Sequence, residues 1–549
     1  MGILEFFKSN ILGQLGDQHG SLWIGEIFFS KKFHLLDYYS LSLFIEPKQN
    51  FNEYLFRDLY NFIYISFSYF LGGILAYNIL TILFLSLNSI SLYFLLKSLN
   101  IKKDISLVFS FFFSLIPYFY VHYEHHTLLI IFPSILIINN LLKSDFNLKI
   151  QNLLYVSFLY FIQIHINLYL GYFLSLYLGI WFLILFFKDR NINILKYFSI
   201  ILILTATFFC IFNFKLVSNF FYPETSNVKY YLPNNTKLDV STFPYEKNRS
   251  LEEFLYFSSR PWYYFLYHTS HPFFGQSTKD IIKYFSEYLD IWIFKNHFPA
   301  EHNASFIGYT LILIISFGIY KKELFKVKIL SYLFWLNIFL IILTMPPVFI
   351  IGSIQIYSPS YLIYMLFPMF RTTARLALFI QLNFFIISAY LVNLYTKNFD
   401  LKKRYLAVFS LVVLLFLDYS FNYKFMGVSR YQETSEYLLK NNSDKKFIAV
   451  YPAGIRIDFL LNMTTHESPI FNPSGFFVRE LNFESGEFTK KLDTCENLKF
   501  FKNLNGGYLV IKDFQNQEFI NISKLDTIFY SQKENITIKS IDKVENICK

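Results

Sequence analysis

The chain has 549 residues, of which 54% are hydrophobic, 21% aromatic and only 16% charged. Soluble domains carry about 25% charged residues, so this composition excludes an ordinary soluble protein. The formal net charge of +10 does not indicate nucleic-acid binding, because most of the extra lysines lie in short loops between apolar runs, where basic residues set membrane orientation.

Apolar runs of roughly 17 to 25 residues recur along the chain, and as helices they are long enough to cross a hydrocarbon layer of about 30 Å. An interfacial segment is expected to end at Gly72 and Gly73, just before the first span. The uncharged stretch 153–187 is too long for one span, so it is divided at "QIHIN". Two spans within 59–96 would instead reverse the side of the N-terminus. The runs predict a mainly α, polytopic transmembrane bundle of about ten spans, near 74–96, 105–120, 127–142, 151–163, 169–187, 196–214, 304–320, 329–344, 376–396 and 404–420.

The short loops between these spans alternate in charge. The connections "VHYEHHT" and "QIHIN" carry no Lys or Arg. The alternation predicts that the basic loops face the cytoplasm and that residues 1–73, 121–126, 215–303, 345–375 and 421–549 lie on the outer side. The basic residues of the five other loops are Lys97, Lys102 and Lys103; Lys143 and Lys149; Lys188, Arg190 and Lys196; Lys321, Lys322, Lys326 and Lys328; and Lys397, Lys402, Lys403 and Arg404.

Five regions follow from this topology. Residues 1–73 form a first extracytoplasmic segment with interfacial helices, 74–214 and 304–420 hold the transmembrane helices, 215–303 form a large outer loop, and 421–549 form a small extracytoplasmic α/β domain. In that domain "ETSEYLLKNN" predicts a helix, and "KKFIAVYPA" and "GYLVIKD" predict strands. The first outer segment is not preceded by a signal peptide or a full span, so either a preceding helix is missing or the first internal span directs insertion.

The cysteines leave two alternatives open. Cys210 lies inside a span, whereas Cys495 and Cys548 share the outer domain. In an oxidising compartment this pair either forms a disulfide or stays reduced. Both alternatives stay open, because a single pair of cysteines gives no spacing pattern that identifies a disulfide framework.

Several outer residues have side chains suited to transfer chemistry. Asp17, in "LGDQHGSLW", and Glu124, in "VHYEHHT", are candidate catalytic carboxylates that could take a proton from an attacking hydroxyl. His125 and His126 are candidates for binding substrate or phosphate. Each has a structural alternative: Asp17 could close a turn, Glu124 could be solvated, and the histidines could be interfacial polar residues.

The arginines Arg371 and Arg375, in "FPMFRTTARLALF", lie at the entrance of a span on the side that is depleted of basic residues. Arginine matches phosphate oxygens with a planar fork, and spacing by four would place both on one helical face if the segment is helical. Anchoring in the lipid headgroups is the alternative.

Three further histidines carry weaker signals. His165 is a candidate packing residue, and His268 and His271 form an HxxH pair that fits either metal ligands or a loop turn. No CxxC or other zinc spacing is present, so the sequence predicts no definite metal site. Whether the protein uses a divalent metal ion stays open.

The order of several stretches resembles the GT-C superfamily of polytopic glycosyltransferases, in particular its YfhO-like bacterial members. The stretches are "LGDQHGSLW", "GGILAYNILTILFLSLNSISLYFLLKSL", "SLIPYFYVHYEHHTLLIIFPSILI", "SFIGYTLILII" and "PSYLIYMLFPMFRTTARLALFI". The resemblance implies a polyprenyl-phosphate-linked sugar as donor, Asp17 as base, and Arg371 and Arg375 as phosphate ligands. The family pattern has a transmembrane helix before the first outer loop, which this sequence lacks.

Other functions stay open beside this one. A lipid or polysaccharide transporter would need ionisable residues near the middle of the membrane, and the predicted spans contain almost none. A non-catalytic membrane assembly protein is the third alternative. The expected partners are the lipid-linked sugar and membrane lipids, with no nucleic acid.

Overall fold

A computed structural model gives the fold. It describes residues 10–12, 22, 26, 29, 59–143, 149–212, 230–231, 237–238, 250–351, 354–422, 425–427, 431–444, 446–451, 493–503, 506–516 and 519–548. The chain forms two compact units. One comprises residues 1–80, 219–245 and 425–549, and the other, which contains most of the helical bundle, comprises residues 81–218 and 246–424.

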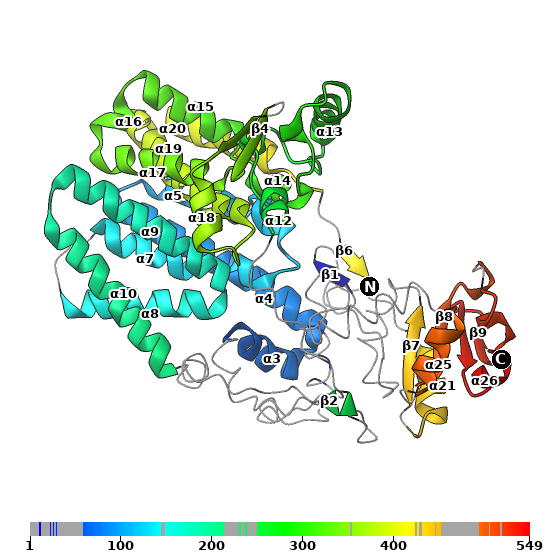
Figure 1. The fold of residues 1–549 in the computed structure, drawn as a ribbon. Helices are drawn as coiled ribbons and strands as arrows, with labels where there is room; N and C mark the ends of the chain where they lie inside the picture. Colours follow the sequence, from blue (N-terminus) through cyan, green and yellow to red (C-terminus); the bar gives the residue numbers. More distant parts are fainter. Residues whose placement is uncertain are drawn as a thin grey trace. The chain divides into compact units, whose positions relative to one another are not determined.

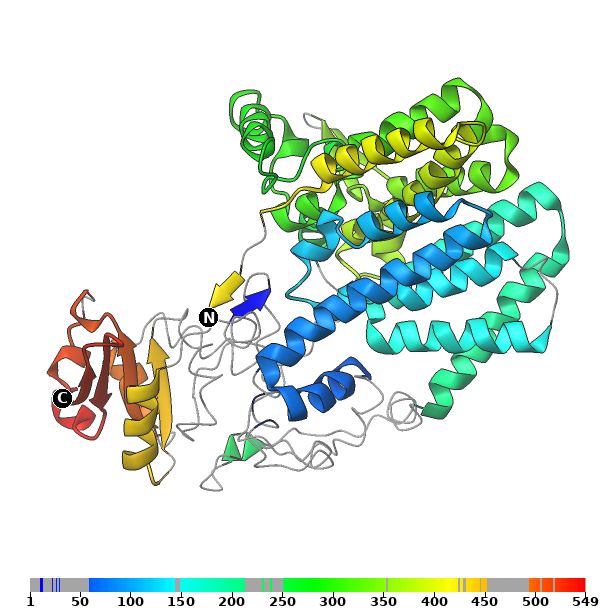
Figure 2. The ribbon, with the colours of Figure 1, turned by 180° about the vertical axis from the view of Figure 1, so that it is seen from behind.

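The helical bundle follows the predicted apolar runs (Figures 1 and 2). Every predicted span falls on one helix or a broken pair of helices. The helices are α4 (Gly73–Ser98), α5 (Lys103–Phe113), α6 (Pro117–Val121), η3 (His126–Leu129), α7 (Phe132–Lys143), α8 (Ile150–Ile166), α9 (Leu168–Asp189), α10 (Ile192–Phe212), α15 (Tyr309–Tyr320), α16 (Glu323–Lys326), α17 (Lys328–Thr344), α19 (Ala377–Tyr395) and α20 (Leu401–Tyr419).

The number of membrane spans is lower by a strict criterion than the predicted ten. In the described part of the chain, six helices are long and apolar enough to cross a membrane, or seven if the bent pair of α14 (Pro299–Ser305) and α15 counts as one span. Helices α8 and α17 are apolar but have only 17 residues each. The fold is therefore that of a multi-pass membrane protein, and the count of ten remains a prediction.

Two helix breaks confirm the divisions made from the sequence. Gly72 has φ +86°, a conformation that favours glycine, and it separates α3 (Leu59–Leu71) from α4. Asn167 separates α8 from α9, and its side chain accepts a hydrogen bond from the backbone N–H of Leu170. That bond satisfies one of the free donors at the start of α9.

Packing in the bundle is centred on α19, which contacts α5, α15 and α17. A neutral polar network stabilises this centre. Asn383 on α19 donates to Asn337 on α17 at 2.8 Å and accepts from the Tyr177 hydroxyl on α9 at 2.9 Å. All three side chains are buried, so their mutual hydrogen bonds offset the cost of leaving water.

The predicted basic loops meet in pairs at one end of the bundle. Arg404 contacts Asp104, Lys102 donates to the carbonyl of Lys397, and Lys328 lies 2.7 Å from Asp189. Helices α5, α9 and α19 each have one terminus at this end. The loops at their other termini therefore gather at the opposite end, where the candidate site lies.

That opposite end is built from short helices and a hairpin. They are α12 (Leu251–Tyr256), η4 (Pro261–Tyr264), α13 (Gly275–Lys283), η5 (Tyr284–Tyr288), η6 (Trp292–Phe294) and α14 from the large loop, then β4 (Val348–Ile351), β5 (Ile354–Tyr357), α18 (Ser360–Leu366) and η7 (Thr373–Leu376). Helix α14 packs on α6 and on η7, which brings three distant stretches of sequence together.

The other unit contains the predicted α/β fold. A four-stranded sheet has the order β7 (Phe447–Tyr451), β8 (Gly506–Lys512), β10 (Ile536–Ser540), β9 (Thr527–Ser531), with β7 parallel to β8 and the other pairs antiparallel. The predicted helix is α21 (Gln432–Asn441), and α25 (Cys495–Asn503) and α26 (Val544–Ile547) follow. A short pair, β1 (Asn10–Leu12) with β6 (Phe425–Gly427), also belongs to this unit, as does the pair β2 (Tyr230–Tyr231) with β3 (Lys237–Leu238).

Cys495 and Cys548 form a disulfide, with Cα atoms 5.4 Å apart. This confirms the first of the two alternatives for the pair. The bridge joins α25 to the residue after α26, beside a core that includes Leu498, Phe501 and Val544.

Candidate functional site

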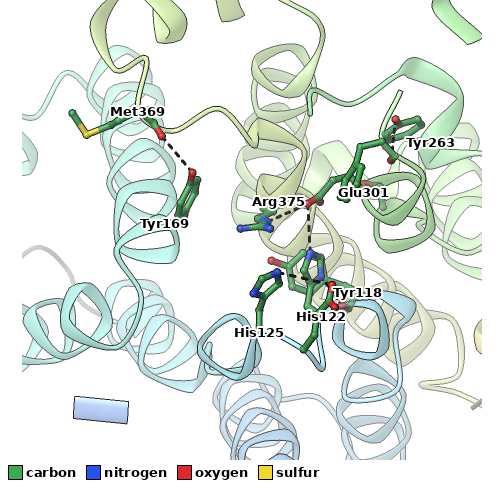
Figure 3. Close-up of polar contacts among 11 residues, drawn as sticks. Tyr118, His122, His125, Tyr169, Tyr263, Glu301, Met369 and Arg375 are labelled. Carbon is green, nitrogen blue, oxygen red and sulfur yellow. Dashed lines mark hydrogen bonds and ion pairs between the residues drawn. The ribbon is translucent and has the colours of Figure 1, made fainter. Parts of the chain in front are cut away.

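Arg375 and Glu301 form the centre of the candidate site (Figure 3). Arg375 lies on η7, directly before the buried helix α19, and Glu301 lies on α14. Arg375 Nε donates to Glu301 Oε1 at 3.1 Å, and the glutamate side chain is only 1% exposed. A buried carboxylate is stable only with a close cation and hydrogen-bond donors, so this contact also fixes the position of the guanidinium.

The guanidinium of Arg375 keeps its outer edge available. Its side chain is 15% exposed, and its carbon lies 5.4 Å from the centre of the Tyr169 ring, at the start of α9. Within the described residues, Nη1 and Nη2 have no hydrogen-bond acceptor. The arginine is therefore held through Nε while the two groups that form its fork can bind an anion.

His122 approaches Glu301 from a third stretch of sequence. Its Nε2 lies 3.6 Å from Glu301 Oε1, and its Nδ1 lies 2.8 Å from the Tyr118 carbonyl oxygen. The rings of His122 and Tyr118 also pack against each other, with centroids 4.3 Å apart and planes tilted by 36°. Glu301 Oε2 is buried without a hydrogen-bond partner in the part of the chain that the structure describes.

His125 also lies close to this cluster (Figure 3). Burial lowers the pKa of its imidazole to about 3, and the charges of Arg375 and His122 act in the same direction. His125 is therefore neutral at physiological pH. In that state one ring nitrogen can donate a hydrogen bond and the other can accept one.

Arg371 is placed differently from Arg375. Its Nη1 lies 2.7 Å from Glu253 Oε1 on α12, and its guanidinium carbon lies 4.5 Å from the centre of the Phe257 ring. Residues 371–372 are not helical, and η7 begins only at Thr373. The condition for a shared helical face is thus not met: the two arginines are held by different acids, because the chain turns before α19 begins.

The other candidate residues from the sequence lie in different surroundings. His126 is buried, and its Nε2 lies 2.5 Å from the Thr81 hydroxyl on α4. Glu124 is about one-third exposed and lies 4.0 Å from His125. Asp17 lies outside the described residues.

The HxxH pair does not resemble a metal site. His268 Nε2 lies 3.1 Å from the Ser420 carbonyl, and His271 Nε2 lies 2.8 Å from the Leu417 carbonyl, so both rings cap the end of α20. Burial lowers the pKa of His268 to about 3, consistent with neutral hydrogen-bonding rings. Across the residues that the structure describes, no group of three or more His, Cys, Asp or Glu side chains could hold a metal ion.

Two residues of the cluster were not singled out from the sequence. His122 is part of the quoted "VHYEHHT", and Glu301 stands three residues before a predicted span. An acidic residue directly before an apolar run was a usable signal for Glu301. Neither position indicated that its partner would be Arg375, because the contact depends on α14 packing on α6 and η7.

Comparisons with known proteins give matches in structure only. No protein-family model matches the sequence, and no characterised relative was found by sequence. The oligosaccharyltransferase of Archaeoglobus fulgidus, in complex with Zn and sulfate, matches over 96% of this chain and 69% of its own length, with 11% identity and a TM-score of 0.49. Archaeal AglB from the same organism, in complex with an inhibitory peptide and a dolichol-phosphate, matches over 92% and 66%, with 11% identity and a TM-score of 0.40.

ArnT from Cupriavidus metallidurans, bound to undecaprenyl phosphate, matches over 98% of this chain and 95% of its own length, with 10% identity and a TM-score of 0.42. The chain spans about two thirds of the length of the two oligosaccharyltransferase chains. The identities and TM-scores of these matches are too low to assign an activity to this chain.

Proposed function

We propose that this protein is a membrane glycosyltransferase that moves a sugar from a polyprenyl-phosphate donor to an acceptor on the outer side of the membrane. The observation that carries the proposal is the hydrogen bonding of the Arg375 guanidinium. Its Nε is fixed by the buried Glu301, while Nη1 and Nη2 have no acceptor among the described residues. A guanidinium held in this way is prepared to bind a phosphate through two parallel hydrogen bonds.

The place of Arg375 in the bundle suits a lipid-linked phosphate. It lies at the start of an apolar helix of 19 residues, at the end of the bundle opposite to the basic loops. The phosphate of a polyprenyl lipid stays near the headgroups because its chain remains in the bilayer. An arginine at that depth can stabilise the charge that grows on the phosphate as the sugar leaves.

We assign the other roles to the remaining candidate residues from the sequence. Arg371 is a second phosphate ligand, using the donors that Glu253 does not occupy, and His125 contributes a neutral hydrogen-bonding ring. Asp17 is the base that takes the proton of the acceptor hydroxyl, with Glu124 as the alternative carboxylate. His126, bonded to Thr81, supports the loop from within.

The test is sugar transfer from a labelled polyprenyl-phosphate donor in membranes, with donor binding measured separately. Arg375→Ala should remove most donor binding. Among the described residues, no other arginine has its Nε bound to a buried acid and both Nη groups without an acceptor. Lys402→Ala is the matched control, since Lys402 is an exposed cation at the opposite end of the bundle. Full transfer and binding in Arg375→Ala would disprove the phosphate site.

A further inference from the structure

We propose that residues 273–289 of the large loop form a membrane-surface anchor, whose exposed apolar side chains lie in the headgroup region of the bilayer at the end of the bundle opposite to the basic loops. This anchor segment contains α13 and the π-helical turn η5. The inference goes beyond the proposed function and does not depend on the binding of a donor.

The anchor segment has an apolar face that no part of the described chain covers. Ile281, Tyr284 and Tyr288 follow one another at intervals of three and four residues, which places them on one side of a helix. Their side chains are 39%, 51% and 74% exposed. An exposed apolar surface of this kind marks a site of interaction with a partner or a membrane. Three more exposed apolar residues flank this face: Phe273, Phe274 and Leu289.

The opposite face of the same helix is charged. Lys279, Lys283 and Glu287 recur every four residues, and Lys283 Nζ lies 3.9 Å from Glu287 Oε2. Together with Asp280 they give the segment two lysines and two acids, so its net charge is zero. A helix with separate apolar and charged faces suits a membrane surface, where the apolar face enters the boundary of headgroups and acyl chains by about 5–10 Å. Tyrosine is also enriched at that depth.

The position of the anchor segment favours lipid as the partner. Phe274 stacks on Tyr267 with ring centroids 4.6 Å apart, and Tyr267 contacts the ring of Tyr309, the first residue of α15, at 5.0 Å. His271 Nε2 lies 2.8 Å from the Leu417 carbonyl near the end of α20. The segment therefore begins where these two bundle helices have their ends, and α13 lies beside that end of the bundle in both views (Figures 1 and 2).

Helices α15 and α20 extend this apolar surface along the bundle. Each has large apolar side chains that are exposed on the outside of the bundle, and in a multi-pass membrane protein such a surface contacts lipid. The apolar face of the anchor segment thus continues a surface that already faces the bilayer. The exposed side chains include Leu313 and Phe317 on α15, and Phe409 and Phe416 on α20.

Stacked and packed rings connect the anchor segment to the candidate site. Phe285 on η5 stacks on Phe294 of η6 at 4.8 Å, and Phe294 stacks on Trp262 of η4 at 5.0 Å. Trp262 contacts the ring of His302 at 4.7 Å. His302 follows Glu301 on α14. An anchor at the membrane surface therefore holds α14, and Glu301 with it, at a fixed depth relative to the lipid headgroups.

The experiment measures the depth of single positions of the anchor segment in the full-length protein. Cys210, the free cysteine among the described residues, is replaced by serine, and an environment-sensitive fluorophore is attached to Tyr288→Cys. Lys283→Cys is the matched control, because it carries the same fluorophore on the charged face of the same helix. The protein is placed in nanodiscs of phosphatidylcholine, which has no net charge, with or without bromine atoms on the acyl chains.

At position 288 the emission should shift to shorter wavelength and lose intensity in the brominated lipid, because the apolar face lies at the boundary of the acyl chains. At position 283 it should do neither, because the charged face stays in water. Tyr284→Cys repeats the measurement at a second position of the apolar face and should behave like Tyr288→Cys. Thermal unfolding of each labelled variant checks that it is folded.

Two outcomes would overturn the proposal. Equal spectra and equal quenching at positions 288 and 283 would mean that the helix does not lie with its apolar face in the bilayer. A shift to shorter wavelength at position 288 without quenching by brominated lipid would mean that protein, such as a second copy of the chain, covers the face. Neither outcome affects the proposed phosphate site, because no donor is present in the measurement.

Discussion

Arg375 donates a hydrogen bond from Nε to Oε1 of the buried Glu301 at 3.1 Å, across 74 positions of sequence. The contact joins the entrance of α19 to α14. It uses one edge of the guanidinium and leaves the other edge with its two nitrogen atoms accessible. This asymmetry is the reason for proposing that Arg375 binds a phosphate and does not only anchor the protein in lipid headgroups.

Arg375→Lys should lower donor use by about ten- to a hundred-fold, the cost of one lost charged hydrogen bond. Lysine keeps the charge, but its single ammonium cannot contact Glu301 and also make two parallel hydrogen bonds to a phosphate. Donor binding and transfer should fall in parallel. Arg371→Lys is the comparison, and it should cost less, because the pair of Arg371 with Glu253 is partly exposed to solvent. The reverse order would contradict the assignment of Arg375 as the main ligand.

Glu301→Ala should lower the free energy of unfolding by about 3–5 kcal/mol, because it leaves a largely buried guanidinium without its acid. Glu301→Gln should cost less, since the amide oxygen can still accept from Arg375 Nε. Denaturation of the purified protein in detergent measures both. Equal stability of the alanine variant and the unmodified protein would mean that the pair does not stabilise the fold.

Asp17→Asn should abolish sugar transfer and leave donor binding nearly intact, because a base is required for the reaction and not for holding the phosphate. Glu124→Gln is the matched variant, and it should retain most activity, since Glu124 is partly exposed to solvent. Transfer and binding assays on the same membranes measure both effects. If Glu124→Gln abolishes transfer while Asp17→Asn does not, Glu124 is the base.

Cys495→Ser with Cys548→Ser should destabilise the C-terminal sheet domain by about 2–4 kcal/mol, because the bridge closes a loop of 53 residues. Hydrogen exchange at β8 and β10 in the full-length protein should become faster. Alkylation of unreduced, denatured protein followed by mass spectrometry tests the bridge directly. Modification of Cys495 or Cys548 without prior reduction would show that the pair is not joined.

Single cysteines at positions 102, 188, 321 and 402 should be protected from impermeant thiol reagents in intact cells, because the proposed topology, based on the bias of basic loops toward the cytoplasm, puts these loops inside. Cysteines placed in the domain 431–549 should be labelled from outside. The pairing of these loops at one end of the bundle motivates the test. Labelling at position 321 from outside would reverse the proposed topology.

The sequence by itself determined the long apolar helices and two of the breaks between them. Long apolar runs predict membrane helices because a backbone in lipid must satisfy its own hydrogen bonds, and the breaks at Gly72 and Asn167 follow from local chemistry that the sequence shows directly. In the C-terminal domain, α21, β7 and β8 were predictable from a different signal, the pattern of apolar residues along the chain. Arg371, Arg375 and His125 could be selected because charged and ionisable groups are rare in such a chain.

Only the tertiary structure decided which of these residues act together. Arg371 and Arg375 are four positions apart but are held by different acids, because residues 371–372 are not helical. His122 and Glu301 are distant in sequence, and they meet Arg375 because α14 packs on α6 and η7. Local patterns record which face of a helix is apolar, but the partner of a buried charge depends on which helices pack together, and that packing is set by the side-chain shapes of the whole bundle.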